Sequence, residues 1–203
     1  MKYILVRHGE TLQNLGQGAN ELDPNASLSP KGLDQTKRAV EKISEILLQE
    51  NVRASLYYSP YRRTKNLAEL LSQKLSFVRV REEPLLSEIQ CGLFSGYTMK
   101  NYALVNPDEY KKFIRYKNEK CRFWYRFPEG ESPFDVYVRV RLFFAQIENE
   151  DENFRVIISH YNTLKILELC LLQADLNWYE ETSGFDNAEI HIIDDGKIVD
   201  QVI

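Results

Sequence analysis

The chain of 203 residues has few cysteines, few histidines and no long apolar run. Its three cysteines, Cys91, Cys121 and Cys170, lie far apart and form no CxxC pair. This argues against a disulfide framework or a zinc site and predicts free thiols in a cytoplasmic compartment. No apolar stretch approaches the ~20 residues that cross a bilayer, and the first apolar segment is too short for a signal peptide. No membrane partner is therefore expected.

Charge of one sign is also missing, since 26 Lys and Arg stand against 30 Asp and Glu, for a net charge of −4. Binding to a nucleic-acid backbone needs a basic face, so nucleic acid is not expected as a partner. An anionic ligand would require cations gathered in one place. A hydrophobic share of 43% and a charged share of 28% are typical of a globular chain, and residues 1–203 are expected to form one domain.

Short apolar runs alternate with stretches of helical periodicity. The expected strands are Lys2–Val6, Ala54–Ser59, Phe77–Glu82, Arg155–Ser159 and a closing hairpin of Ala188–Ile193 with Ile198–Ile203. The expected helices begin at Pro30, Tyr61, Asp108, Pro133 and Asn162. The core face of the first helix is expected to contain Leu33, Thr36, Val40, Ile43 and Leu47. This order predicts a three-layer α/β/α sandwich over a mainly parallel sheet. Residues 85–131 are irregular and are interpreted as an insertion that forms a lid or side wall.

Two of the three histidines, His8 and His160, each end an apolar strand. Ligands of open parallel sheets bind beyond the carboxyl ends of the strands, so these two imidazoles are expected to share one site. The third, His191, alternates inside the last strand and is expected to be structural.

Arginines accompany the same strand ends. Arg7 adjoins His8, and Arg62 and Arg63 begin a helix directly after a strand. A guanidinium group binds phosphate through two parallel charge-assisted hydrogen bonds, and helix N-termini add N–H donors. Arg62 is equally consistent with a solvated helix surface. The pattern predicts a local cationic pocket for an anion.

The segment from Arg7 to Asn14 resembles the R-H-G-E-[ST]-x-x-N signature of the histidine phosphatase superfamily, also called the phosphoglycerate mutase-like family. Other segments follow in the family's order. Residues 28–35 resemble its L-[ST]-x-x-G-x-x-Q helix start, 59–63 (Ser-Pro-Tyr-Arg-Arg) its S-P-L-x-R, and 86–96 its L-x-E-x-x-x-G-x-x-x-G, with Gly130-Glu131-Ser132 and Ser159-His160 completing the set. The resemblance covers nearly the whole chain and implies the phosphoglycerate mutase-like fold.

The resemblance also implies the chemistry. His8 would be the nucleophile that takes a phosphoryl group on a ring nitrogen, and an adjacent Arg7 cation would favour its neutral form. Glu88 would protonate the leaving oxygen and then activate water. The residues implied for phosphate or substrate binding are Arg7, Asn14, Arg63 and His160, to which the polar loop adds Asn20. No metal and no cofactor are implied, and no metal-ligand spacing is present.

The chain departs from the family after the second histidine. Tyr161 follows His160 where the family usually has glycine, and it is expected to narrow the pocket or to hydrogen-bond the substrate. The cofactor-dependent mutases of the family are longer and carry an R-H-Y-G-x-L-x-G-x-N-K stretch after the acid, which is missing after Glu88. This favours a phosphatase over a mutase. A non-catalytic scaffold is the third reading, although such members typically lose the nucleophile or the acid, and both are present here.

The substrate is predicted from the wall region. Trp124, Tyr125 and Arg126 lie just before the Gly130 motif, where they either pack in a core or bind substrate. Arg126 would clamp a substrate carboxylate. A small carboxylated phosphoester is therefore expected, phosphoserine first and 3-phosphoglycerate second. The sequence is compatible with a homodimer.

Overall fold

The computed structural model describes residues 1–14, 23–97 and 99–202. Its strands are β1 (Lys2–Arg7), β2 (Ser55–Tyr58), β3 (Arg79–Glu82), β4 (Phe154–Ser159), β5 (Ile190–Asp194) and β6 (Lys197–Val202). Its α-helices are α1 (Pro30–Gln49), α2 (Arg62–Lys74), α3 (Met99–Val105), α4 (Pro107–Asn118), α5 (Pro133–Ile147), α6 (Tyr161–Leu171) and α7 (Leu176–Glu181). Short 3-10 turns are η1 (Pro84–Leu86), η2 (Gly92–Phe94) and η3 (Arg122–Trp124).

The strands form one six-stranded sheet in the order β3-β2-β4-β1-β5-β6. The first four strands are parallel, and β5 and β6 add an antiparallel edge. The predicted mainly parallel sheet is confirmed. Since the two central strands β4 and β1 come from opposite ends of the chain, their carboxyl ends bring distant segments together.

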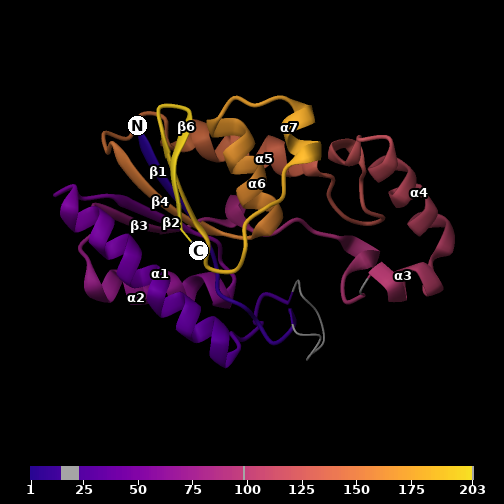
Figure 1. The fold of residues 1–203 in the computed structure, drawn as a ribbon, viewed down its shortest axis with the longest axis horizontal. Coiled ribbons are helices and arrows are strands. Elements are labelled where there is room, and N and C mark those ends of the chain that lie inside the picture. The colour runs from indigo at the N-terminus through magenta and orange to yellow at the C-terminus, as the bar shows by residue number, and fades with distance from the viewer. Residues whose placement is uncertain (15–22, 98, 203) are drawn as a thin grey trace.

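Alternation along the strands creates two cores. Leu5 and Ile157 point to the face covered by α5 and α6, whereas Ile4 and Val156 point to the face covered by α1 and α2. Side chains of successive strand residues point to opposite faces, so central strands that are apolar throughout need helices on both sides. Figure 1 shows these helix layers on either side of the sheet, which confirms the predicted three-layer sandwich.

One expected core residue is exposed instead. Leu33 has 47% of its surface exposed, whereas the rest of the predicted face of α1 is buried. The reason is Gly32, whose backbone lies so close to Glu10 that an added Cβ would come within 1.8 Å of the Glu10 carbonyl oxygen. Gly32 thus takes the inward position in the first turn of α1, and Leu33 is rotated toward solvent.

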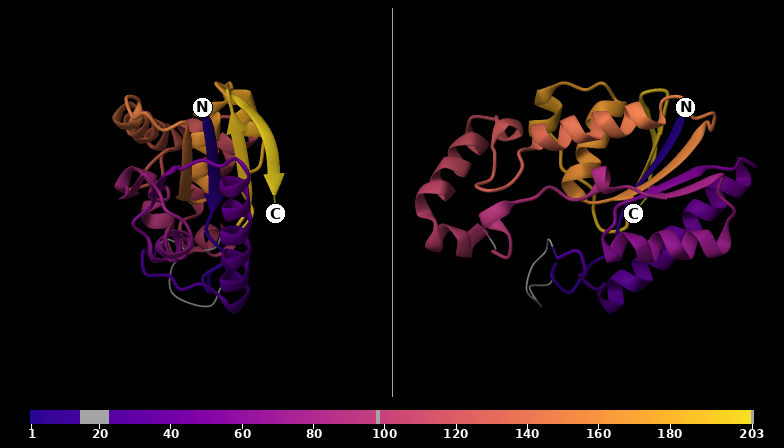
Figure 2. Two further views of the ribbon diagram at one scale, coloured as in Figure 1. Left: turned by 90° about the vertical axis from the view of Figure 1, so that its left-hand side faces the viewer. Right: turned by 180° about the vertical axis from the view of Figure 1, so that it is seen from behind.

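Residues 85–131 contain more regular structure than the sequence pattern predicted. Both α3 and η3 were missed, and so was α7 later in the chain. The views in Figures 1 and 2 agree that α3 and α4 lie beyond one end of the sheet, as an arm. The arm has an aromatic core of its own, which consists of Phe94, Tyr102 and Tyr125. Its function as a lid or side wall stays a prediction.

None of Cys91, Cys121 and Cys170 forms a disulfide bond among the described residues. Across the described ranges, no helix is both long enough and apolar enough to cross a membrane.

The core beneath α5 allows a direct test of the packing. Phe143 is fully buried and meets the ring of Tyr57 edge-on at 5.3 Å, whereas its neighbour Leu142 is 55% exposed. Phe143→Ala should lower the free energy of unfolding by about 3–5 kcal/mol because it leaves a cavity. Leu142→Ala, the matched control, should change it by less than about 1 kcal/mol. Urea denaturation measures both, and equal effects would contradict this packing.

Candidate active site

The parallel pairing of β1 with β4 brings the two histidines together. Arg7 is in register with Ser159, so the next residues, His8 and His160, leave the sheet side by side. Their ring centroids are 5.1 Å apart, and both side chains are buried. The prediction that two strand-end imidazoles meet beyond the carboxyl ends of the sheet therefore agrees with the geometry.

Hydrogen bonds determine the tautomer of His8. Nδ1 of His8 lies 2.8 Å from the carbonyl oxygen of Gly9, which can only accept, so Nδ1 carries the proton. Nε2 lies 3.0 Å from Nε of Arg63, which can only donate, so Nε2 presents its lone pair. The backbone of His8 is also held, because its carbonyl oxygen accepts from Ala188 N. His8 thus points an unprotonated nitrogen at an arginine.

His160 is the N-cap residue of α6, and its Nε2 lies 2.7 Å from Oγ of Ser59. Its Nδ1 is buried and has no hydrogen-bond partner in the part of the chain that the structure describes. A buried polar nitrogen without a partner is costly, which makes Nδ1 the atom of this ring that is left for a ligand. Ser59 was not predicted as a site residue, although it begins the Ser-Pro-Tyr-Arg-Arg segment.

Burial and two arginines keep the imidazoles neutral. Burial lowers the pKa of His8 well below its ordinary value, and the charges of Arg63 and Arg7 lower it further. Burial likewise lowers the pKa of His160, again with help from Arg63. A neutral ring is the form that can attack phosphorus.

The two arginines are anchored by backbone oxygens. Nη1 of Arg63 donates to the carbonyl of Asp23, and Nη1 of Arg7 donates to the carbonyl of Phe185. Burial lowers the pKa of Arg63 to about 10, so its guanidinium remains charged at neutral pH. The structure therefore places the predicted residues Arg7 and Arg63 beside the histidine pair. No sequence motif pointed to Phe185.

The side chain of Glu88 lies at the N-terminus of α6, the helix that begins directly after His160. Its carboxylate accepts from the backbone N–H groups of Asn162 and Thr163, each at 3.3 Å, and from that of Ile89 at 2.8 Å. A carboxylate at a helix N-terminus is stabilised by these donors and by the helix dipole. Glu88 is buried, and its charge raises the pKa of Arg63, so it belongs to the same electrostatic unit.

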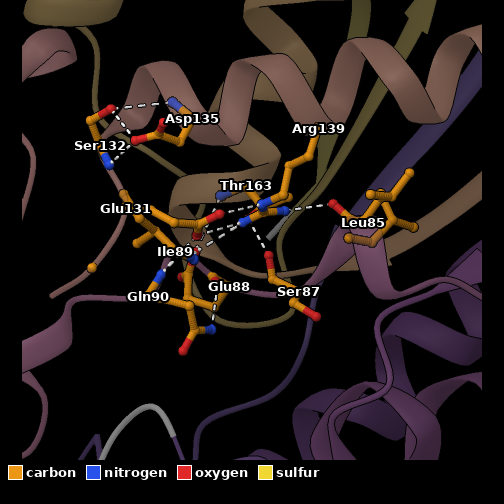
Figure 3. A network of polar contacts seen from close by, with 12 residues as sticks. Leu85, Ser87, Glu88, Ile89, Gln90, Glu131, Ser132, Asp135, Arg139 and Thr163 are labelled. Atoms are coloured by element: carbon orange, nitrogen blue, oxygen red, sulfur yellow. Dashed lines mark hydrogen bonds and ion pairs between the residues drawn. The ribbon is translucent and has the colours of Figure 1, made fainter.

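A polar network supports the segment that carries Glu88 (Figure 3). Arg139 on α5 donates to Glu131 at 3.0 Å and to the carbonyl of Leu85. The Glu131 carboxylate in turn accepts from Gln90 N at 2.9 Å. The network thus holds residues on both sides of Glu88. Glu131 belongs to one of the motifs seen in the sequence, whereas no sequence signal singled out Arg139 or Gln90.

The two asparagines have different outcomes. Oδ1 of Asn14 accepts from Thr11 N at 3.0 Å, which leaves its amide NH2 as the end that can donate to a ligand. Asn20 lies outside the described residues.

Among the described residues, no contact joins Trp124, Tyr125 or Arg126 to the two histidines. Tyr125 is 1% exposed and packs edge-on against Phe113 and Phe127. This corrects its prediction as a substrate contact, because its large apolar ring is enclosed by the aromatic core of the arm.

Trp124 and Arg126 are exposed. Trp124 packs against Phe134 at 5.2 Å between ring centroids. Arg126 forms an ion pair with Asp135 and donates to the carbonyl of Gly130. Its guanidinium is therefore oriented by α5, and it would meet a substrate carboxylate only in competition with Asp135.

Tyr161 lies beside Arg7. Its ring centroid is 5.3 Å from the guanidinium carbon of Arg7, and its hydroxyl accepts from Gly184 N at 3.0 Å. Tyr161 therefore lies between Arg7 and Gly184, and its contact with Arg7 was not predicted from the sequence. That it narrows the pocket or binds substrate stays a prediction.

Paired neutral histidines beside two guanidinium groups and a buried carboxylate are suited to phosphoryl transfer. Guanidinium groups stabilise the charge of the phosphoryl oxygens, a neutral imidazole accepts phosphorus, and a carboxyl group handles the leaving-group proton. Among the described residues, no group of three or more His, Cys, Asp or Glu side chains is placed to hold a metal ion.

Comparisons with known proteins identify the class. The sequence model of the histidine phosphatase superfamily (branch 1) matches residues 3–197. A phosphoglycerate mutase-like protein of Arabidopsis thaliana is 29% identical over 96% of this chain and 74% of its own length. The metal-independent phosphoserine phosphatase of the same plant is 29% identical over 84% of this chain and 68% of its own length.

A solved structure supports the fold. The α-ribazole phosphatase of Shigella flexneri superposes with a TM-score of 0.78 at 21% identity, covering 96% of this chain and 90% of that one. Since the family match extends over nearly the whole chain, the chain belongs to the histidine phosphatase superfamily and is a histidine-type phosphatase.

The buried histidines predict how stability depends on pH. In the unfolded chain a histidine titrates near 6.5, whereas burial lowers the folded pKa of His8 and His160. Below pH 6.5 the unfolded chain therefore binds more protons, and the free energy of unfolding falls as the pH drops, by at most about 1.4 kcal/mol per pH unit for each histidine. Urea unfolding should show a shallower slope between about pH 5 and 6.5 in His8→Gln.

His191 is the matched control. Burial opposes its charge, but hydrogen bonds to Glu168 and Glu189 raise its pKa in the folded chain. Protonated His191 therefore stabilises the folded chain fully below pH 6.5, and this stabilisation is lost only as the pH rises through the raised pKa of the folded chain. His191→Gln should therefore leave the slope between about pH 5 and 6.5 unchanged. A slope insensitive to His8→Gln would contradict the neutral imidazole.

Proposed function

We propose that this phosphatase hydrolyses phosphomonoesters through a covalent phosphohistidine at His8. The observation that carries the proposal is the orientation of His8, whose Nδ1 is bound to the Gly9 carbonyl and whose Nε2 lone pair meets Arg63. A nucleophile needs a lone pair held toward the phosphate-binding cations, and this arrangement supplies it.

The reaction has two steps. In the first, Nε2 of His8 bonds to phosphorus, the bond from phosphorus to the ester oxygen breaks, and Glu88 gives its proton to that oxygen. In the second, Glu88 takes a proton from water, the water oxygen bonds to phosphorus, and the phosphorus–nitrogen bond breaks. Arg63 Nε releases the nitrogen lone pair when the phosphoryl group arrives and then donates to a phosphoryl oxygen, together with Arg7 and His160.

The roles of Glu88 and His8 can be distinguished by comparing phosphoserine with p-nitrophenyl phosphate. His8→Ala should abolish phosphate release from every substrate because no phosphoenzyme forms. Glu88→Gln should lower kcat/KM for an alkyl ester such as phosphoserine by about 10²–10⁴-fold, the contribution of a general acid. The ratio kcat/KM reports only the steps up to release of the leaving group, so it does not include the role of Glu88 as base in the second step. The effect of this substitution on p-nitrophenyl phosphate should be much smaller because that leaving group needs no proton.

Phosphate release is measured with EDTA present, and trapped phosphoenzyme is detected as an acid-labile, base-stable adduct. Full activity in His8→Ala would refute the covalent mechanism. Equal losses of kcat/KM for both substrates in Glu88→Gln would exclude its role as the acid.

The substrate belongs to the same proposal, with phosphoserine first and 3-phosphoglycerate second. Two observations support a small carboxylated ester: a relative named as a metal-independent phosphoserine phosphatase, and the cation of Arg126 exposed on the wall. A substrate carboxylate would take the place of Asp135 on this guanidinium. The α-ribazole phosphatase has a similar fold and a different substrate, so phosphoserine has to be tested against other phosphomonoesters.

A panel of phosphomonoesters tests whether Arg126 binds the carboxylate of the substrate. Arg126→Ala should lower kcat/KM for phosphoserine by about 10- to 100-fold, the worth of a charge-assisted hydrogen-bond pair, and should spare p-nitrophenyl phosphate. Arg115→Ala, an exposed arginine on α4 of the same arm, is the control. Uniform turnover of all substrates in the unaltered chain would contradict a carboxylate clamp. Isomerisation of 3-phosphoglycerate without phosphate release would favour the mutase.

Location and partners complete the proposal. The three cysteines form no disulfide bond among the described residues, which supports a reducing, cytoplasmic compartment. The net charge of −4 supports a small phosphorylated substrate rather than nucleic acid as partner. A homodimer remains compatible with the sequence, and neither a membrane partner nor a cofactor is proposed.

A further inference from the structure

Two tyrosines stand where the family's motifs have other residues. Tyr61 occupies the leucine position of S-P-L-x-R, and Tyr161 follows His160 where glycine is usual. Each ring lies against one of the two arginines of the site. The guanidinium carbon of Arg63 is 4.7 Å from the ring centroid of Tyr61, and that of Arg7 is 5.3 Å from the ring centroid of Tyr161. Both distances are within the range of cation–π attraction.

The rings themselves are held in place. The hydroxyl of Tyr61 accepts from Nε2 of Gln90 at 2.8 Å, and its ring packs edge-on against His160 at 4.8 Å. The hydroxyl of Tyr161 accepts from Gly184 N at 3.0 Å. Gly184 also lies against the face of Tyr161, since an added Cβ would come within 2.7–2.9 Å of three ring carbons. Each tyrosine therefore has one partner that fixes its ring and presents its face to an arginine.

Repulsion between the two arginines gives these contacts a physical purpose. Arg7 and Arg63 repel each other, and each lowers the pKa of His8. Without a bound anion, two guanidinium groups in a buried site tend to separate, and a displaced arginine no longer meets the phosphoryl oxygens. The electron-rich faces of two tyrosines offset this repulsion without adding a negative charge that would compete with phosphate.

We propose that Tyr61 and Tyr161 are positioning residues that hold Arg63 and Arg7 ready for the phosphoryl group. The inference deepens the proposed function and rests on it, because it assigns a purpose to residues around the same arginines. It names no new step: the tyrosines act on the arginines, and the arginines act on the substrate.

Replacing the rings by leucine tests the proposal. Tyr61→Leu and Tyr161→Leu should each weaken inhibition by vanadate about tenfold and lower kcat/KM for p-nitrophenyl phosphate by a similar factor. Tyr61→Phe and Tyr161→Phe keep the ring and should retain activity within about threefold of the unaltered chain. Tyr116→Leu is the matched control, since Arg115 lies 5.7 Å from that ring in the arm, and it should leave vanadate inhibition unchanged.

A double-mutant cycle separates positioning from general loss of structure. In an Arg7→Gln background the further effect of Tyr161→Leu should shrink to about twofold or less, because no cation is left for the ring to hold. Undiminished, additive effects would overturn the proposal, as would an unchanged vanadate inhibition constant in both leucine variants.

Gly184→Ala keeps the test decisive if a leucine variant fails to fold. It leaves every charge in place and forces the Tyr161 ring away from its position, so it should also weaken vanadate inhibition. An unchanged inhibition constant in folded Gly184→Ala would refute the role of Tyr161. Failure of the proposed function is distinguishable, since it would appear as full activity in His8→Ala, whatever the tyrosine variants do.

Discussion

The parallel pairing of β1 with β4 is the contact on which the rest of the structure depends. It joins the first strand to a strand more than 140 residues later, and its register places Arg7 opposite Ser159. Both strands end at the same side of the sheet, so the ring centroids of His8 and His160 are 5.1 Å apart. Apolar side chains on both faces of these strands hold the pairing in place, which makes the two hydrophobic cores the support of the site.

Around this edge the protein buries positive charge beside neutral rings. Two arginines and two desolvated histidines would be unfavourable without partners, and the partners come from separate elements: backbone carbonyls of Asp23 and Phe185, and the carboxylate of Glu88. Glu88 in turn depends on the N-terminus of α6 and on the Arg139–Glu131 network. A phosphoryl group entering this site meets cations already in position, so little reorganisation remains for the moment of reaction.

Much of this could be predicted from local patterns. The apolar run at residues 2–6 predicts a central strand, and Arg7-His8-Gly9 directly after it predicts a site because strand ends bind ligands. Leu33 shows where such reasoning fails: helical periodicity placed it in the core, but close backbone contact of Gly32 with Glu10 turned it outward. Tyr125 shows the same limit, since its place beside a motif predicted a contact with substrate, whereas its side chain is buried.

By itself, the sequence determined the order of the strands and of the helices α1, α2, α4, α5 and α6, the family, and the residues able to carry phosphoryl chemistry, because periodicity and motifs are properties of neighbouring positions. Only the tertiary structure decided which nitrogen of His8 bears the proton, which tyrosine faces which arginine, and that Arg126 is bound by Asp135. The contacts of His8 with Arg63 and of Arg7 with Tyr161 join residues far apart in the chain, and they exist only after the sheet has brought its strand ends together. The contacts of Tyr61 with Arg63 and of Arg126 with Asp135 join near neighbours, but the direction of those side chains is not a property of the sequence pattern.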